Sequence, residues 1–125
     1  HVIMAALASE NKYLCHPASV DSIPTSTDKE DHVSMGVTSG RKLHEVIRNV
    51  KICLGIEFLC NTQGIELLRP LKTNSALEEV YSLVRKHVKP ILKDRAFYKD
   101  IEAITNLVSN FEILDVVEKK LGKLK

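Results

Sequence analysis

Hydrophobic residues recur at spacings of three and four along most of the chain, which is typical of one face of an α-helix. Residues 1–13 carry this pattern, and a much longer one runs over residues 30–68 without a proline. Shorter helical patterns occupy residues 74–125. Residues 14–29 contain two prolines, which disfavour helical angles at the preceding residues, so this segment is predicted to be an extended loop. No useful stretch has the period of a strand, and the pattern predicts an all-α fold.

Helix ends are marked by residues with defined conformational preferences. Pro70 is predicted to end the long helix, because proline cannot continue the hydrogen-bonding pattern. Ser75 and Glu78 have the spacing of a capping box and are predicted to open the next helix. Asp100 is predicted to cap a short helix, and Gly122 to end the last one.

The long helix is apolar over most of its circumference. Its main stripe comprises Leu43, Val46, Ile47, Val50 and Leu54. Further apolar residues, Ile52, Ile56 and Leu59, lie off this stripe. A helix of this kind must be enclosed by neighbours on several sides, and the chain has few helices to supply them. Burial inside a larger helical bundle or an oligomer core is therefore expected.

Composition and charge exclude several classes of protein. With 44% hydrophobic and 27% charged residues, the 125-residue chain has an ordinary soluble composition and one domain's worth of core. A net charge of +2 gives no reason to expect nucleic acid or a lipid surface as partner, and no apolar run is long enough to span a membrane. The chain opens inside a helical pattern at His1, so it reads as part of something longer.

The cysteine pattern indicates a reducing compartment. Cys15, Cys53 and Cys60 are odd in number and have no CxxC spacing, which argues against a disulfide framework and a zinc site. A cytoplasmic location fits best. Cys53 and Cys60 are seven residues apart and are interpreted as small core residues on one helix face.

The candidate chemistry lies in the consecutive residues Glu30, Asp31 and His32. On a helix such residues point roughly 100° apart, so they cannot converge on one metal ion or form a relay. Their spacing by itself favours a structural role over a catalytic one. The carboxylates are then expected in the first turn of the long helix, where they complement its dipole. The predicted caps of that helix are Thr25, Ser26 or Asp28.

Two other candidates carry little chemistry. His16 and His32 are separated by the loop and have no ligand-spaced cysteine beside them, so no metal is expected. The tripeptide Thr38, Ser39 and Gly40 lacks the preceding strand and the glycine spacing of a nucleophile or phosphate site. The small residues Gly36, Ser39 and Gly40 are instead interpreted as allowing close helix packing.

One stretch resembles a known family. "SENK" from Ser9, "HPASVDSIPTS" from His16 and "EDHVSM" from Glu30 closely resemble the corresponding segments of histidine ammonia-lyases, which belong to the aromatic amino acid ammonia-lyases. A looser similarity continues through "RKLHEVIRNVKICLGIEFLCNTQGIELLRPLKTN" and "DRAFYKDIEAI", so it covers nearly the whole chain. Lys29 departs from the glutamine common before Glu-Asp-His in the family, which leaves the role of that position open but keeps Glu30 in register.

The resemblance implies a mostly helical homotetramer of the ammonia-lyase/fumarase-like type. Long helices from different subunits form its central bundle, and three subunits build each active site. The family converts L-histidine to trans-urocanate and ammonia, and it needs no external cofactor. Its electrophile is 4-methylidene-imidazol-5-one, which forms from an internal Ala-Ser-Gly. That tripeptide is absent here, so the chain resembles the C-terminal portion of the enzyme and is expected to be inactive alone.

The resemblance also gives Glu30 a role. Related lyases that act on phenylalanine or tyrosine typically carry glutamine at the matching position, whereas a carboxylate can pair with the imidazole of histidine. Glu30 is therefore expected to contact the substrate imidazole or to act as the base, and the family's tyrosine competes for the second role. Asp31 and His32 are expected to have structural roles, in support of the helix start and the loop before it. Two alternatives stay open: a non-catalytic helical interaction subunit derived from a lyase, and a lyase or aminomutase for another aromatic amino acid.

Overall fold

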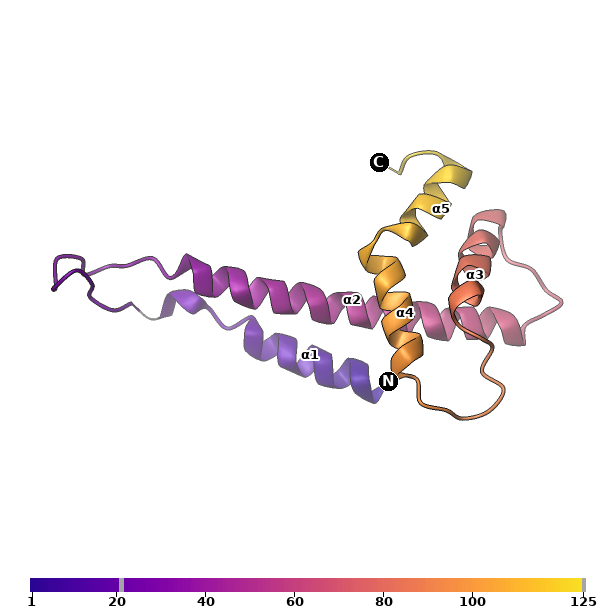
Figure 1. Cartoon of the computed structure of the whole chain (residues 1–125), viewed down its shortest axis with the longest axis horizontal. Coiled ribbons are helices and arrows are strands. Elements are labelled where there is room, and N and C mark those ends of the chain that lie inside the picture. The colour runs from indigo at the N-terminus through magenta and orange to yellow at the C-terminus, as the bar shows by residue number, and fades with distance from the viewer. Residues whose placement is uncertain (21, 125) are drawn as a thin grey trace. The chain divides into compact units, whose positions relative to one another are not determined.

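Five α-helices form the regular structure in the computed structural model, which describes residues 1–20 and 22–124 (Figure 1). They are α1 (Val2–Leu14), α2 (Gly36–Leu67), α3 (Ser75–His87), α4 (Tyr98–Ser109) and α5 (Glu112–Leu121), with a 3₁₀ turn at Ala18–Val20. Within the described residues there is no strand, only an isolated bridge between Thr25 and Glu30. The all-α prediction is confirmed. None of the helices in this part of the chain is long and apolar enough to cross a membrane.

The long helix begins later than the sequence pattern suggested. It was expected over residues 30–68, but α2 starts at Gly36, so Glu30 and Asp31 do not lie in its first turn. The reason is that the preceding residues pair across a tight reversal, and Ser26, Thr27 and Asp28 have φ angles of 55°, 58° and 61°. Left-handed angles cannot enter an α-helix, so the expected caps and the dipole argument for the two carboxylates are wrong.

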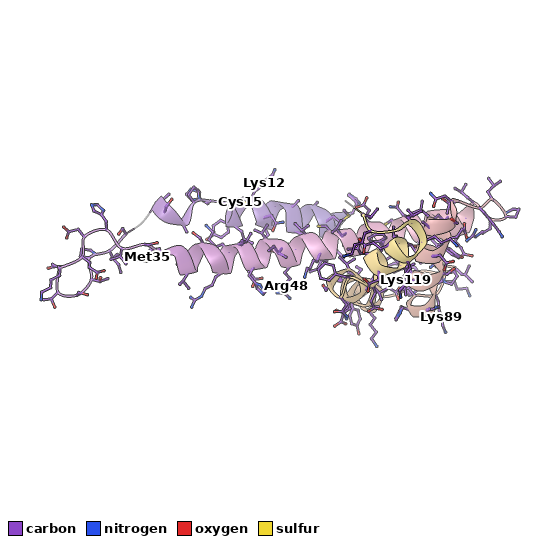
Figure 2. All side chains as sticks on the ribbon, turned by 90° about the horizontal axis from the view of Figure 1, so that it is seen from above. Lys12, Cys15, Met35, Arg48, Lys89 and Lys119 are labelled. Atoms are coloured by element: carbon purple, nitrogen blue, oxygen red, sulfur yellow. The ribbon has the colours of Figure 1, made fainter. Side chains whose placement is uncertain are left out.

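The first compact unit, His1–Val50, contains α1 and the first part of α2, which lie side by side (Figures 1 and 2). Asn49 joins them: its side-chain amide donates to Glu10 Oε2 at 2.9 Å and to Asn11 Oδ1 at 3.0 Å. Asn49 is 5% exposed, and it is the only buried residue among the described residues of this unit. The apolar faces of these two helix segments are therefore largely uncovered within the unit.

The apolar stripe of α2 shows this directly. Leu43, Ile47 and Val50 are 59%, 45% and 45% exposed, and none of the other helix segments in their unit covers them. A helix that is apolar over most of its circumference requires neighbours on several sides. Within the described residues of this unit, α1 covers α2 on one side only. Within this unit the stripe is therefore largely exposed.

The second compact unit, Lys51–Lys125, has a core of its own. The second part of α2 contributes Leu59 to this core, and Val88 directly after α3 contributes another buried side chain. The three later helices contribute Val80, Val84, Ile104, Leu107 and Ile113. Val84 and Ile104 are completely buried. Because α5 packs against both α3 and α4, one apolar cluster holds the unit together.

A close helix approach occurs in this unit. A Cβ atom placed on Gly55 of α2 would lie 2.6 Å from Thr105 Oγ1, 3.2 Å from Thr105 N and 3.3 Å from Thr105 Cα on α4. The Thr105 hydroxyl is buried, and no described residue forms a hydrogen bond with it. The absence of a side chain at Gly55 therefore lets the backbones of α2 and α4 come together.

The helix ends in this unit follow the predictions in part. α5 covers Glu112–Leu121 and ends at Gly122, as predicted. The cap of α3 is Asn74, which accepts from the Leu77 amide, and not Ser75.

The predicted cap of α4 is also wrong. Phe97 precedes α4, whereas Asp100 lies inside its first turn. There the Asp100 carboxylate pairs with Arg95, with 2.8 Å between Nη2 and Oδ2. An arginine partner brought close by the fold has replaced the backbone amides that a capping carboxylate would bind.

Cysteine placement differs from the sequence interpretation at one residue. Cys15, Cys53 and Cys60 are all free thiols. Cys53 is half-buried, but Cys60 is exposed, so its assignment to the core is wrong. At this point of α2 the adjacent Leu59, and not Cys60, belongs to the core of the unit.

A polar network closes the connection between α2 and α3. Arg69 forms an ion pair with Glu78, and Arg85 forms one with Glu66, at 2.8 and 3.0 Å. Tyr81 lies between the two ion pairs. The Arg69 guanidinium is 4.3 Å from the centroid of the Tyr81 ring, and the Tyr81 hydroxyl donates a hydrogen bond to Glu66. Each guanidinium thus neutralises one carboxylate while it contacts the same aromatic ring.

The network predicts loss of stability in acid. The Tyr81 hydroxyl, followed by Arg85, holds the pKa of Glu66 below its ordinary value, and Arg69 with the Thr73 amide does the same for Glu78. A carboxylate with a lowered folded pKa stabilises the fold fully above its unfolded pKa of about 4.3, and this contribution is lost as pH falls through the folded value. Urea unfolding of the chain, followed by circular dichroism, should therefore show a falling midpoint below about pH 4.

Two variants check this interpretation. Glu78→Gln should flatten the decline in the urea midpoint, because its side chain cannot titrate. Glu57→Gln replaces an exposed carboxylate on α2 and should leave the slope as it is. An acid slope that is the same in Glu78→Gln as in the original chain would contradict the assignment.

Candidate active-site loop

The candidate residue Glu30 lies at the base of a reversed loop in the first unit. Its amide donates to the Thr25 carbonyl at 3.3 Å, and its carbonyl accepts from the Thr25 amide at 3.0 Å. Thr25 Oγ1 also donates to Glu30 Oε2 at 3.3 Å. The backbone and side chain of one threonine therefore both contact Glu30, and they define where its carboxylate leaves the loop.

A second closure lies farther from the tip. Ser22 Oγ accepts a hydrogen bond from the Val33 amide at 3.0 Å and donates to the Val33 carbonyl at 3.3 Å. Near the end of α1, the carbonyl of His16 accepts a hydrogen bond from the Lys42 ammonium of α2. The Ser22 bonds close the loop on itself, whereas the Lys42 contact connects the segment between α1 and α2 to α2.

Glu30 itself is exposed in this chain. Its carboxylate accepts from Thr25, and the described residues place no cation or imidazole against it. The geometry can deliver a carboxylate to a group outside the unit, but the rest of such a site is not built from these residues.

A cavity of about 370 Å³ lies at the start of α2, beside the loop. Glu30 does not line it, whereas His32 does. The other lining residues are Ala18, Ser19, Ser22, Val33, Ser34, Met35, Gly36 and Ser39. Figure 2 shows Met35 at the point where the loop enters α2. Serine hydroxyls and one imidazole can form hydrogen bonds here, but no carboxylate is available to act as a base.

The three consecutive residues Glu30, Asp31 and His32 have different surroundings, but they do not lie on the helix on which the sequence argument placed them. Glu30 pairs with the opposite side of the loop, Asp31 is exposed, and His32 faces the cavity. Sequence reasoning missed the contribution of Ser22, because the only signal was a serine eleven residues before Val33 in a segment with no regular period.

The remaining sequence candidates are structural. Thr38, Ser39 and Gly40 lie within α2, so they do not form a nucleophile turn. A Cβ atom at Gly40 would have no neighbour within 4 Å among the described residues, so the expected close packing is not found there. Gly55, in the second unit, is the glycine that such packing requires.

Comparisons with known proteins point to one family. The family model for aromatic amino acid lyases matches residues 1–86. Histidine ammonia-lyase from Bos taurus is 50% identical over 125 residues, which are all of this chain and 19% of that protein. The chain therefore spans about a fifth of the length of this curated relative.

Solved structures agree with this result. The crystal structure of histidine ammonia-lyase from Trypanosoma cruzi superposes with a TM-score of 0.90 at 48% identity, covering 95% of this chain and 24% of that one. Tyrosine aminomutase from Streptomyces globisporus gives a TM-score of 0.87 at 30% identity, covering 96% of this chain and 23% of that one. Because the family model spans more than half of the sequence and the fold agrees, this chain belongs to the aromatic amino acid lyase family.

Proposed function

We propose that this chain is a portion of a histidine ammonia-lyase, and that the complete protein eliminates ammonia from L-histidine to give trans-urocanate. The observation that carries the proposal is 50% identity to a histidine ammonia-lyase along all 125 residues. The 30% identity to a tyrosine aminomutase over nearly the same length is markedly lower and favours histidine as the substrate.

In this proposal the chain contributes Glu30. A carboxylate can accept a hydrogen bond from an imidazole N–H or pair with the protonated ring, which a neutral glutamine does less strongly. The exposed position of Glu30, held by Thr25, supports a role toward a substrate bound by other parts of the protein. The proposal gives this carboxylate one of two roles, as the anchor of the imidazole or as the base that accepts a proton from the substrate, and experiment distinguishes them.

The electrophile of the reaction belongs to the rest of the protein. The family's 4-methylidene-imidazol-5-one forms from Ala-Ser-Gly, and this tripeptide does not occur in the 125 residues. None of the residues described here can form that group, so this chain alone is expected to be inactive. In the complete protein this group supplies the electrophile of the reaction. The residues of this chain bind and orient the imidazole of the substrate.

The proposal includes assembly with further copies or segments. The apolar stripe of α2 is 45–59% exposed at Leu43, Ile47 and Val50, and burying such side chains is favourable by about 25 cal/mol per Å². A homotetramer with a central bundle of long helices, as the family resemblance implies, would cover these residues. The exposed stripe supports this arrangement.

The test uses the complete protein encoded by the continuous reading frame. That frame should contain Ala-Ser-Gly upstream of His1, and the purified protein should convert L-histidine to urocanate, followed by ultraviolet absorbance. Turnover of L-tyrosine and L-phenylalanine measured in parallel should be lower by about 100-fold or more, since neither ring offers the imidazole N–H or the protonated imidazole that the carboxylate is proposed to bind. Preferential turnover of either would indicate a lyase or aminomutase for another substrate. A frame that begins immediately before His1 would indicate a non-catalytic interaction subunit.

A further inference from the structure

The two closures of the candidate loop share one register. Thr25 pairs with Glu30 through two backbone hydrogen bonds, and Ser22 pairs with Val33 three residues farther out on each side. In an antiparallel pair, backbone hydrogen bonds connect only every second pair of opposite residues. Three residues from a bonded pair, the two backbones do not exchange hydrogen bonds. The Ser22 hydroxyl supplies both bonds at a position where the main chain cannot.

The tip of this loop needs such support. Ser26, Thr27 and Asp28 all have positive φ angles, and the left-handed region costs a non-glycine residue roughly 1 kcal/mol or more. Thr27 is also β-branched, which makes this conformation less favourable still. Residues in these conformations persist only where surrounding contacts hold them. The structure places two such contacts below the tip, and one of them is the Ser22 hydroxyl.

We propose that Ser22 is a positioning residue for Glu30, and this inference rests on the proposed function. Ser22 holds Val33, three residues after Glu30, while Thr25 holds Glu30 itself. Without the Ser22 hydroxyl, the outer end of the loop opens, and Thr25 alone restricts the direction in which the Glu30 carboxylate leaves the loop. Ser22 touches neither substrate nor electrophile in this scheme; it acts through Glu30.

The first measurement is steady-state turnover of L-histidine by the complete protein. Ser22→Ala should lower kcat/KM about tenfold, because a displaced catalytic group loses much of its effect even when it is still present. Ser22→Thr keeps the hydroxyl and should restore most of the activity. Ser34→Ala is the matched control, since Ser34 is an exposed serine of the same loop, and this variant should retain full activity.

A double-mutant cycle separates positioning from a general structural effect. If Ser22 acts through Glu30, Ser22→Ala should have no further effect on kcat/KM in a Glu30→Ala background. The same tenfold loss in both backgrounds, or no loss in the original background, would overturn the proposal.

Hydrogen exchange gives a readout that does not depend on activity. In the complete protein, Ser22→Ala should accelerate exchange of the Val33 and Glu30 amides, whereas Ser34→Ala should not. Unchanged exchange would overturn the proposal. A wild-type protein that produces no urocanate would refute the proposed function instead, and the exchange result would still decide whether Ser22 holds the loop.

Discussion

Glu30→Ala in the complete protein is expected to lower kcat/KM for L-histidine by about tenfold or more, while the assembly stays intact by size-exclusion chromatography. Either proposed role leads to a loss of this size: a general base contributes roughly 10²–10⁴-fold, and a hydrogen bond to a charged group contributes about 1.5–3 kcal/mol. Glu30 is exposed and contacts only its own loop in this chain, so the substitution should not disturb the fold.

Glu30→Gln distinguishes the two roles. Glutamine keeps the size and a hydrogen-bond acceptor but cannot take a proton. If Glu30 anchors the imidazole, Glu30→Gln should mainly raise KM and lose less activity than Glu30→Ala. If Glu30 is the base, both variants should lose kcat equally.

The neighbouring carboxylate provides the control for this experiment. Asp31→Asn removes an exposed charge one residue away from Glu30. It should change kcat/KM by less than about threefold, because the proposal gives Asp31 no contact with the substrate. Turnover at the original rate in both Glu30 variants would refute the role assigned to this residue.

Gly55→Ala is expected to destabilise the second unit by about 1–3 kcal/mol, the usual cost of inserting atoms into a packed interface. The new Cβ would lie 2.6 Å from Thr105 Oγ1 and 3.3 Å or less from two Thr105 backbone atoms. The hydroxyl can rotate away, but the backbone of α4 cannot, so α2 and α4 must separate. Urea unfolding of the chain, followed by circular dichroism, measures the effect.

Gly64→Ala is the matched control on the same helix. A Cβ atom at Gly64 has no neighbour within 4 Å among the described residues. Alanine is favoured over glycine inside a helix by about 0.5–1 kcal/mol, so this variant should be more stable than the original chain. Opposite signs for the two glycines are therefore expected, and equal signs would contradict the close approach.

The neighbouring threonine allows a second check. Adding Thr105→Ala to Gly55→Ala removes the nearest atom and a buried hydroxyl that no described residue satisfies. Part of the lost stability should return, because the 2.6 Å contact disappears while the two backbone contacts stay. A double variant that is less stable than Gly55→Ala would show that the conflict at Gly55 lies elsewhere.

Local sequence determined most of the helical architecture. Apolar spacing located every long helix, and Pro70 and Gly122 marked helix ends close to those observed, because both residues act on their own backbone. The segments around Ser9, His16 and Glu30 were sufficient to indicate the family. Charge and composition described the chain without identifying any site.

Only the tertiary structure decided where α2 begins and how Glu30 is held. The pattern of hydrophobic residues continues through residues 30–35, but pairing of Glu30 with Thr25 and of Val33 with Ser22 excludes these residues from the helix. The sequence pattern also did not predict that Asp100 pairs with Arg95 or that Gly55 lies against Thr105. In each case the decisive contact joins residues several to many positions apart, and the free energy of such a contact depends on the folded chain, which no local periodicity contains.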